Sequence, residues 1–396
     1  MKVAQTLLQQ DLSHIALSVN SKTARDVEVA LSKSVLNLDD FMALISPAAT
    51  PYLENMATRA HTLTRQRFGN TMQLFVPLYL SNLCANECTY CGFTMSNKIK
   101  RTTLSINETL EEINAINTMG FSQVLLVTGE HESKVGMHYF EQVIDAIRDN
   151  VSYLMMEVQP LDCTEYEKLK TLGLDAVLVY QETYSPSYYG NYHTRGKKQD
   201  FMWRLEASDR LGQAGIDKIG IGALLGLGNW RVDSVMTALH AQTIQQHYWQ
   251  SRVSIAFPRL RRCEGNSEVG SIDRNLNLPN ERQLLQLICA HRIYNPYAEL
   301  TLSTRESAKF RDGAMTLGIT SMSAASQTQP GGYSKPTQAL NQFDIDDNRT
   351  VSEVVNAIHA NGLDTIWQDW LPFQSRDKPV QQVSSTNAKS GVKFVI

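Results

Sequence analysis

Residues 74–93 contain the most informative pattern in this sequence. They read Leu74-Phe75-Val76-Pro77-Leu78-Tyr79-Leu80, followed by Ser81-Asn82-Leu83-Cys84-Ala85-Asn86-Glu87-Cys88-Thr89-Tyr90-Cys91-Gly92-Phe93. The first seven residues form a short apolar run, which is typical of a buried strand. The remaining residues predict a loop in which three cysteines fall within eight positions. Potential metal ligands therefore directly follow a strand.

The spacing of these cysteines indicates an iron–sulfur site. Thiolates bind such clusters, and a fully ligated 4Fe–4S cluster takes four of them. Cys84, Cys88 and Cys91 have no fourth cysteine nearby, and the nearest histidines, His61 and His131, lie far along the chain. One iron would therefore stay open for a substrate or cofactor. A zinc site or reduced surface cysteines are the alternatives, although a structural zinc site usually has a fourth ligand close by.

The pattern of apolar and amphipathic segments on both sides of this loop predicts the fold. Short apolar runs alternate with amphipathic helical patterns, which favours parallel strands joined by right-handed crossovers. The helical patterns include residues 106–119, 139–150, 165–172, 201–214, 232–248 and 281–294. About eight such strands over some 250 residues match an α/β fold of the (β/α)8 TIM-barrel type better than an open sheet. The eight runs are Leu74–Leu80, Val124–Thr128, Tyr153–Val158, Ala176–Tyr180, Ile219–Ala223, Arg252–Ala256, Glu299–Leu302 and Ile319–Met322.

The sequence divides into three parts. Residues 1–70 predict an N-terminal helical extension, because residues 24–31, 36–45 and 52–67 are rich in Ala, Leu and Arg at amphipathic spacing. Residues 71–325 predict the barrel. Residues 326–396 are loop-rich apart from one helical pattern, and we expect them to form a C-terminal extension that covers the barrel mouth.

Composition limits the partners. The 396 residues include 37 Lys plus Arg and 40 Asp plus Glu, so no general electrostatic attraction to nucleic acid or an anionic membrane is expected. No apolar run reaches the length of about 18 residues that a membrane span needs, and the N-terminus lacks the pattern of a signal peptide. We therefore expect a cytoplasmic enzyme in a reducing compartment. Cys163, Cys263 and Cys289 are scattered and are expected to be small buried residues.

Polar residues at predicted strand ends are candidate site residues, because barrel active sites lie at the C-terminal ends of the strands. Gly129 and Glu130 end the second strand, Glu182 follows the fourth, and Arg305 follows the seventh. Arg305 could bind a carboxylate through two hydrogen bonds, or could form a structural ion pair. Gly222 permits close approach of a ligand to the backbone, or simply tight strand–helix packing.

Two loop histidines, His131 and His193, could transfer protons. A lone loop histidine is more often a polar surface residue, and this is what we expect for both.

The spacing Cys-x3-Cys-x2-Cys, with Tyr90 just before the last cysteine, resembles the radical S-adenosylmethionine superfamily. The resemblance implies one 4Fe–4S cluster whose open iron chelates S-adenosylmethionine, with a 5′-deoxyadenosyl radical as the hydrogen-abstracting species. It implies that Cys84, Cys88 and Cys91 bind the cluster. We assign five residues to cofactor binding: Tyr90, Gly129, Glu130, Glu182 and Gly222.

Motifs outside the cysteine loop resemble the aromatic amino acid lyase branch, in particular the tyrosine lyases of thiamine thiazole biosynthesis. This implies cleavage of the Cα–Cβ bond of L-tyrosine to 2-iminoacetate and p-cresol, with Arg305 binding the substrate carboxylate. It also implies delivery of the imine to a thiazole synthase and a flavodoxin- or ferredoxin-type reductant. The motifs are residues 65–70, 79–93, 156–161, 180–184, 193–200, 257–261, 302–306, 328–333 and 367–370.

Related lyases remain as alternatives. The tyrosine lyase that matures FeFe-hydrogenase carries a second cluster on a C-terminal cysteine motif, whereas this chain has no cysteine after Cys289. A lyase for tryptophan or another amino acid is a weaker alternative. A non-catalytic iron–sulfur or zinc scaffold is the alternative outside enzymology.

Overall fold

The computed structural model describes residues 2–263, 278–337 and 339–367. It begins with five helices: α1 (Lys2–Leu8), α2 (Leu12–Ser21), α3 (Ala24–Ser32), α4 (Leu38–Ile45) and α5 (Leu53–Phe68), with the 3-10 helix η1 (Pro47–Tyr52) before α5. Local sequence sets where α3 and α4 begin. Thr23 with Asp26, and Asn37 with Asp40, form capping boxes that satisfy free backbone N–H groups of the first turn.

Eight parallel strands form a closed barrel, as the sequence predicted. Their order around the barrel follows the chain, and β10 closes it by pairing with β1 through Gln73–Ser321, Leu74–Met322 and Phe75–Ser323. The strands are β1 (Thr71–Ser81), β3 (Gln123–Thr128), β4 (Tyr153–Glu157), β5 (Ala176–Leu178), β7 (Lys218–Gly222), β8 (Arg252–Ala256), β9 (Glu299–Leu302) and β10 (Ser321–Ser323).

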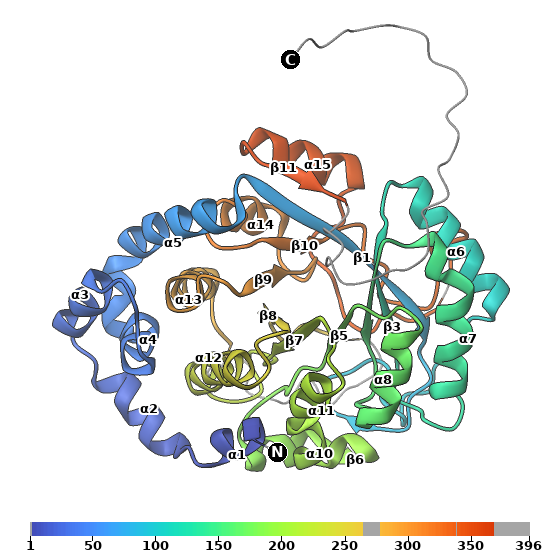
Figure 1. The fold of residues 1–396 in the computed structure, drawn as a ribbon, viewed down its shortest axis with the longest axis horizontal. Coiled ribbons are helices and arrows are strands. Elements are labelled where there is room, and N and C mark those ends of the chain that lie inside the picture. Colours follow the sequence, from blue (N-terminus) through green and yellow to red (C-terminus); the bar gives the residue numbers. More distant parts are fainter. Residues whose placement is uncertain (1, 264–277, 338, 368–396) are drawn as a thin grey trace, which may run out of the picture.

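Helices cover the outside of the barrel (Figure 1). The helical pattern predicted over residues 201–214 forms two helices that meet at Glu206, and α9 and α14 were not predicted. The helices are α6 (Ile106–Thr118), α7 (Met137–Ile147), α8 (Cys163–Thr171), α9 (Pro186–Tyr192), α10 (Phe201–Leu205), α11 (Ala207–Gln213), α12 (Trp230–His247), α13 (Glu281–Tyr294) and α14 (Ala308–Ala314), with 3-10 helices η2 (Arg148–Asn150) and η3 (Lys197–Gln199).

The alternation of side chains along each strand produces two cores. On β1, Leu74, Val76 and Leu78 pack in the large core between strands and helices. Phe75 and Tyr79 belong instead to a smaller cluster with inward-facing residues of β3, β4 and β5. The interior of the barrel is therefore filled by side chains below the level of the strand ends, as in other barrels of this type.

The N-terminal helices curve around one side of the barrel, outside α12 and α13 (Figure 1). Buried hydrogen bonds attach them to it. The backbone N–H groups of Val3 and Ala4 donate to Asp209 on α11, and Gln286 Nε2 on α13 donates to the carbonyl oxygens of Leu44 and Ser46. Burying these polar groups without partners would be costly, so the bonds fix the position of the helices.

The chain after β10 contacts both ends of the barrel. Residues 326–343 include side chains that line the cavity at the C-terminal strand ends. Helix α15 (Val351–Ala360) and strand β11 (Asp364–Ile366) lie elsewhere, because β11 pairs with the beginning of β1 at Thr71–Gln73. This ninth strand was not predicted. Residues 368–396 of the predicted extension lie outside the described residues.

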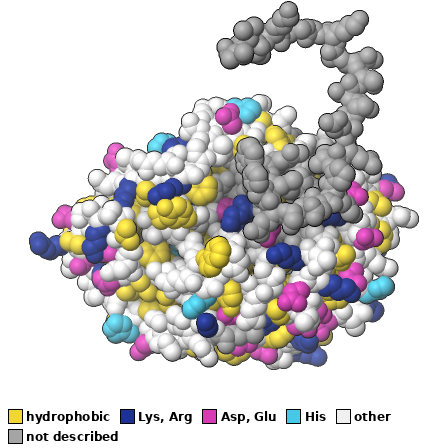
Figure 2. Space-filling view, in the orientation of Figure 1, with side chains coloured by type: hydrophobic (Ala, Val, Ile, Leu, Met, Phe, Trp, Pro, Cys, Tyr) yellow, Lys and Arg dark blue, Asp and Glu magenta, His cyan; other side chains and the backbone are white. Residues whose placement is uncertain are grey.

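Charges of both signs are mixed on the face of the molecule seen in Figure 2, where basic and acidic side chains of the described residues are interspersed. No helix in the described part of the chain is long and apolar enough to cross a membrane.

Candidate active site

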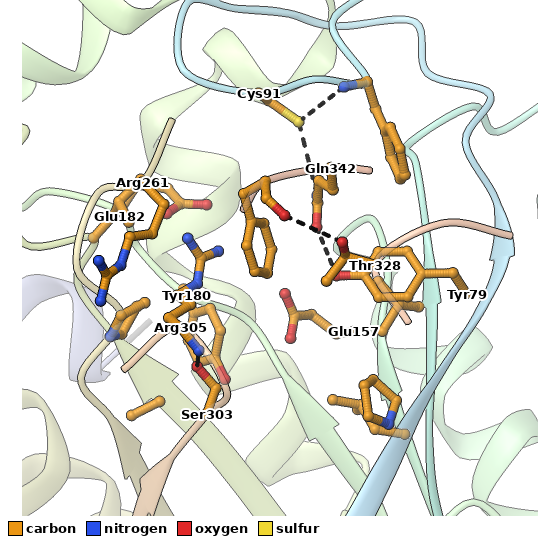
Figure 3. Close-up of a pocket in the computed structure, with 18 of the residues that line it drawn as sticks. Tyr79, Cys91, Glu157, Tyr180, Glu182, Arg261, Ser303, Arg305, Thr328 and Gln342 are labelled. Carbon is orange, nitrogen blue, oxygen red and sulfur yellow. Dashed lines mark hydrogen bonds between the residues drawn. The ribbon is translucent and has the colours of Figure 1, made fainter. Parts of the chain in front are cut away.

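A cavity opens at the C-terminal ends of the barrel strands (Figure 3). Its volume of about 170 Å³ exceeds the roughly 150 Å³ of an engineered protein cavity that binds benzene, so an aromatic ring can fit. Eight of the nine predicted site residues line it: Cys84, Cys88, Cys91, Tyr90, Gly129, Glu130, Glu182 and Arg305. The ninth, Gly222, ends β7 but is not among the lining residues.

The cysteine loop is attached to the end of β3. The backbone N–H of Ala85 donates to the carbonyl oxygen of Glu130, and that of Gly129 donates to the carbonyl oxygen of Ser81. Each N–O distance is 2.8 Å. A Cβ atom at Gly129 would lie 2.4 Å from the carbonyl oxygen of Leu83 and 3.1 Å from Cβ of Cys84. Glycine is therefore required at position 129 because the cysteine loop passes directly over it.

The three cysteines supply the thiol ligands that an iron–sulfur cluster requires. All three are free thiols that line one cavity. Burial raises the pKa of Cys84 to about 11 and raises those of Cys88 and Cys91, so thiolates here need a cationic partner. Among the described residues, no three His, Cys, Asp or Glu side chains could hold one metal ion together.

Two N–H donors reach the last cysteine. The backbone N–H of Phe93 lies 3.4 Å from Sγ of Cys91, and Nε2 of Gln342 lies 3.7 Å from it. Donors of this kind favour the thiolate that a metal requires, and they tune a bound cluster. Gln342 also accepts a hydrogen bond from the hydroxyl of Tyr79 at 2.7 Å, so the segment after the barrel contacts the cysteine loop (Figure 3).

His193 is buried, so the expectation of a surface histidine was wrong for this residue. Its Nδ1 lies 2.8 Å from the carbonyl oxygen of Tyr189, so Nδ1 carries the proton and Nε2 accepts from the hydroxyl of Tyr90 at 2.8 Å. Burial, helped by the Lys198 cation, lowers the pKa of His193 to about 3. The ring stays neutral and fixes the orientation of Tyr90 between Cys88 and Cys91. Strand pairing between β2 (Glu87–Cys88) and β6 (His193–Arg195) brings these segments together.

Glu130 and Glu182 belong to a buried network with two cations. Arg204 lies 3.0 Å from Glu130, and Lys198 lies 2.8 Å from Glu182. Each cation also approaches the other carboxylate, Arg204 to 3.8 Å from Glu182 and Lys198 to 4.0 Å from Glu130. Burial alone would raise the pKa of both carboxyls. The Lys198 and Arg204 cations outweigh it, so the pKa of Glu130 falls below its ordinary value and that of Glu182 falls to about 2. Both carboxylates are ionised and face the cavity.

The backbone around Glu182 is unusual. Its φ of 70° lies in the left-handed region, where a side-chain-bearing residue is strained. The strain is sustained by tertiary contacts, because the carbonyl oxygen of Glu182 accepts from Leu224 N–H at 2.8 Å. Gly222 lies beside this turn, and a Cβ there would meet the Ala256 carbonyl oxygen at 2.8 Å. Close packing of neighbouring strands thus accounts for glycine at position 222.

Arg305 and Glu157 complete the polar lining (Figure 3). The guanidinium of Arg305 stacks over the ring of Phe343 at 3.3 Å and has no carboxylate within 4.0 Å among the described residues. The structural ion pair considered for Arg305 is therefore not observed. Glu157 ends β4, and burial together with the charge of Glu182 raises its pKa to about 7. Both side chains point into the same part of the cavity.

Sequence reasoning missed three residues of this site, Glu157, Lys198 and Arg204, and expected a fourth, His193, to lie at the surface. All except Arg204 fall in motifs that carried the family resemblance, but nothing local distinguished them from other polar residues. Glu157 is the last residue of β4, whereas His193, Lys198 and Arg204 lie in the long segment between β5 and β7, where no strand end marked them. Of the three scattered cysteines, only Cys289 is buried as expected, whereas Cys163 and Cys263 are partly exposed.

Comparison with known proteins agrees with this geometry. The model of the Radical SAM superfamily matches residues 78–239, and that of the Biotin and Thiamin Synthesis associated domain matches residues 256–364. The chain is 57% identical over 369 residues to 2-iminoacetate synthase of Escherichia coli (strain K12), covering 93% of this chain and 96% of that protein. It is 55% identical, with the same coverage, to 2-iminoacetate synthase of Salmonella typhimurium (strain LT2).

A solved structure extends the likeness to the fold. The FeFe-hydrogenase maturase HydG from Carboxydothermus hydrogenoformans is 30% identical, with a TM-score of 0.82, over 92% of this chain and 84% of that one. A parallel barrel with a cysteine loop at its mouth thus defines a radical S-adenosylmethionine enzyme. The chain belongs to the 2-iminoacetate synthase family, the tyrosine lyases of thiamine thiazole synthesis.

Proposed function

We propose that this chain cleaves the Cα–Cβ bond of L-tyrosine with one 4Fe–4S cluster on Cys84, Cys88 and Cys91 and with S-adenosylmethionine bound beside it. The observation that carries the proposal is a single cavity that combines three free cysteines at one wall with an unpaired arginine at another. The bound cluster and S-adenosylmethionine supply the hydrogen-abstracting radical. The chain's own residues position the reactants and exclude water.

The charged residues divide into two sets with separate tasks. Glu130 and Glu182, held by Lys198 and Arg204, lie with Tyr90 and the cysteines and would bind the polar groups of S-adenosylmethionine. Arg305 lies deeper, above the barrel interior, and would bind the carboxylate of tyrosine. Preorganised charges of this kind hold reactants in place without reorganisation of the site.

Two partners follow from the chemistry. The imine product reacts readily with water, so we expect direct delivery to a thiazole synthase. Cluster reduction requires a one-electron donor, for which a flavodoxin- or ferredoxin-type protein is suited. Free cysteines and an oxidisable cluster fit a reducing compartment such as the cytoplasm.

The test uses protein reconstituted with iron and sulfide under anaerobic conditions. With S-adenosylmethionine, dithionite and L-tyrosine, we expect p-cresol and 5′-deoxyadenosine; L-tryptophan should give no p-cresol. Cys88→Ala should abolish both products, whereas the control Cys163→Ala, which alters a partly exposed cysteine at the start of α8, should retain them. Deoxyadenosine formed only with tryptophan would reject tyrosine as substrate, and the absence of both products with every amino acid would reject the radical chemistry.

A further inference from the structure

Three carboxylates line the cavity, and one of them has no charged partner. Glu130 and Glu182 pair with Arg204 and Lys198. Glu157 makes no ion pair or side-chain hydrogen bond with any described residue, although its side chain lines the same cavity. Glu157 is half-buried at the end of β4, and a carboxylate partly removed from water without a partner is costly, so its presence calls for a ligand that supplies one.

Arg305 is the corresponding cation, since no carboxylate of the described residues pairs with it. Its guanidinium stacks on Phe343, and among the described residues its side chain makes one hydrogen bond, a long one of 3.5 Å to the carbonyl oxygen of Arg259. Arg305 and Glu157 are near enough for each to influence the pKa of the other, yet they do not pair with each other. Figure 3 shows the guanidinium and the carboxylate directed into one space. That space is thus bounded by one cation and one anion, each open to a ligand.

We propose that Glu157 binds the α-amino group of the substrate while Arg305 binds its carboxylate, so that the cavity recognises a free α-amino acid by both charges. This rests on the proposed tyrosine lyase function and adds a substrate contact that the sequence did not predict. The two charged groups of an α-amino acid are attached to the same carbon. A single zwitterion therefore neutralises both side chains at once.

The state of Glu157 agrees with this assignment. Its burial and the neighbouring Glu182 charge raise its pKa to about 7. An arriving ammonium group favours the ionised carboxylate, because an opposite charge stabilises the charged form. The aromatic rings of Tyr79 and Tyr180 line the cavity beside these charges and suit the side chain of an aromatic amino acid.

Equilibrium binding to the reconstituted enzyme with S-adenosylmethionine, without reductant, tests the proposal. The ligands are L-tyrosine, 3-(4-hydroxyphenyl)propanoate, which lacks the amino group, and tyramine, which lacks the carboxylate. Glu157→Gln should weaken L-tyrosine binding by about tenfold or more, the loss expected for a hydrogen bond to a charged group. It should leave binding of the propanoate within about twofold, since that ligand has no amino group to lose.

Three controls make the result specific. Arg305→Gln should show the converse pattern, weakening L-tyrosine but sparing tyramine. Glu157→Asp keeps the charge and should retain the preference for ligands with an amino group. Glu111→Gln removes an exposed carboxylate on α6 and should change neither affinity.

The proposal is overturned if Glu157→Gln weakens tyrosine and the propanoate equally, or leaves tyrosine binding unchanged. The iron content of each variant, compared with the wild type, shows whether the site is still assembled. A wild-type enzyme that forms no p-cresol would refute the proposed function instead, so the two failures are distinguishable.

Discussion

Gly129 lies where the end of β3 meets the cysteine loop, and its lack of a side chain is what lets the two backbones approach. The atoms that a Cβ would strike belong to the backbone at Leu83, which cannot rotate away as the end of a flexible side chain could. The sequence showed only a glycine at a strand end, whereas the structure shows that its missing side chain leaves room for the backbone at Leu83 and Cys84. Tertiary contact, rather than turn geometry, explains this residue.

Replacing Gly129 with alanine should therefore displace the cysteine loop. We expect Gly129→Ala to lower the iron bound per chain after reconstitution and to reduce the free energy of unfolding by about 1–3 kcal/mol, the usual cost of overpacking. Iron analysis and urea unfolding measure the two effects. Gly313→Ala is the control, because a Cβ there meets nothing within 4 Å on α14; equal iron content in both variants would contradict the proposed packing role.

Helix α13 joins the N-terminal helices to the barrel at the scale of single elements. His291 on this helix packs edge-on against Phe41 of α4 at 4.8 Å and against Phe257 after β8 at 5.2 Å. Its Nδ1 has no hydrogen-bond partner in the described part of the chain. Burial, with a smaller contribution from Arg292, lowers the pKa of His291 to about 3.

This contact predicts a pH dependence of stability. Because the folded-state pKa of His291 lies below the ordinary value of 6.5, the unfolded chain binds the proton more readily, and stability is lost as pH falls below about 6.5. A single such histidine contributes a loss of about 2 kcal/mol between pH 7 and pH 5, at 1.36 kcal/mol per pH unit.

His291→Gln should reduce the slope of unfolding free energy against pH over this range, measured with urea at several pH values. The exposed residue His14 on α2 provides the control, since His14→Gln removes a histidine outside the core. The same slope in His291→Gln and wild type would show that His291 does not resist protonation in the fold.

Most elements could be predicted because their causes are local. The apolar runs of the eight strands match the observed ones, since a strand buried on both faces is apolar throughout. Strand β11 could not be predicted, because three residues have no periodicity and the strand exists only by pairing with Thr71–Gln73. Helix α9 is short, and the expected helix at 201–214 divides at Glu206 for packing reasons that its sequence does not show.

At the scale of the whole molecule, the N-terminal helices and the barrel share buried contacts. Asp209 on α11 accepts from the backbone of Val3 and Ala4, and Thr64 on α5 donates to the carbonyl oxygen of Leu317. Buried hydrogen bonds of this kind are lost together when either part unfolds. The helical extension is therefore expected to depend on the barrel for its stability.

We expect a single unfolding transition in urea. All five tryptophans lie beyond residue 202, so their fluorescence reports the barrel and the C-terminal region, whereas far-UV circular dichroism also reports the N-terminal helices. The two signals should give the same midpoint for the apoprotein. A midpoint at lower urea concentration by circular dichroism than by fluorescence would mean that residues 1–70 unfold independently. Asp209→Ala removes the carboxylate that accepts hydrogen bonds from the backbone of α1, and this variant is expected to separate the two midpoints.

The sequence by itself determined the barrel, the cysteine loop at its mouth and the family resemblance, because strand patterns and ligand spacing are encoded within short segments. Only the tertiary structure revealed the partners of those residues. It brought Lys198 and Arg204 to Glu182 and Glu130, placed His193 against Tyr90, and left Glu157 unpaired near Arg305. Glu130, Glu157 and Arg305 come from different strand ends, whereas Glu182, His193, Lys198 and Arg204 come from the segment between β5 and β7. Only the closed fold sets the distances between them.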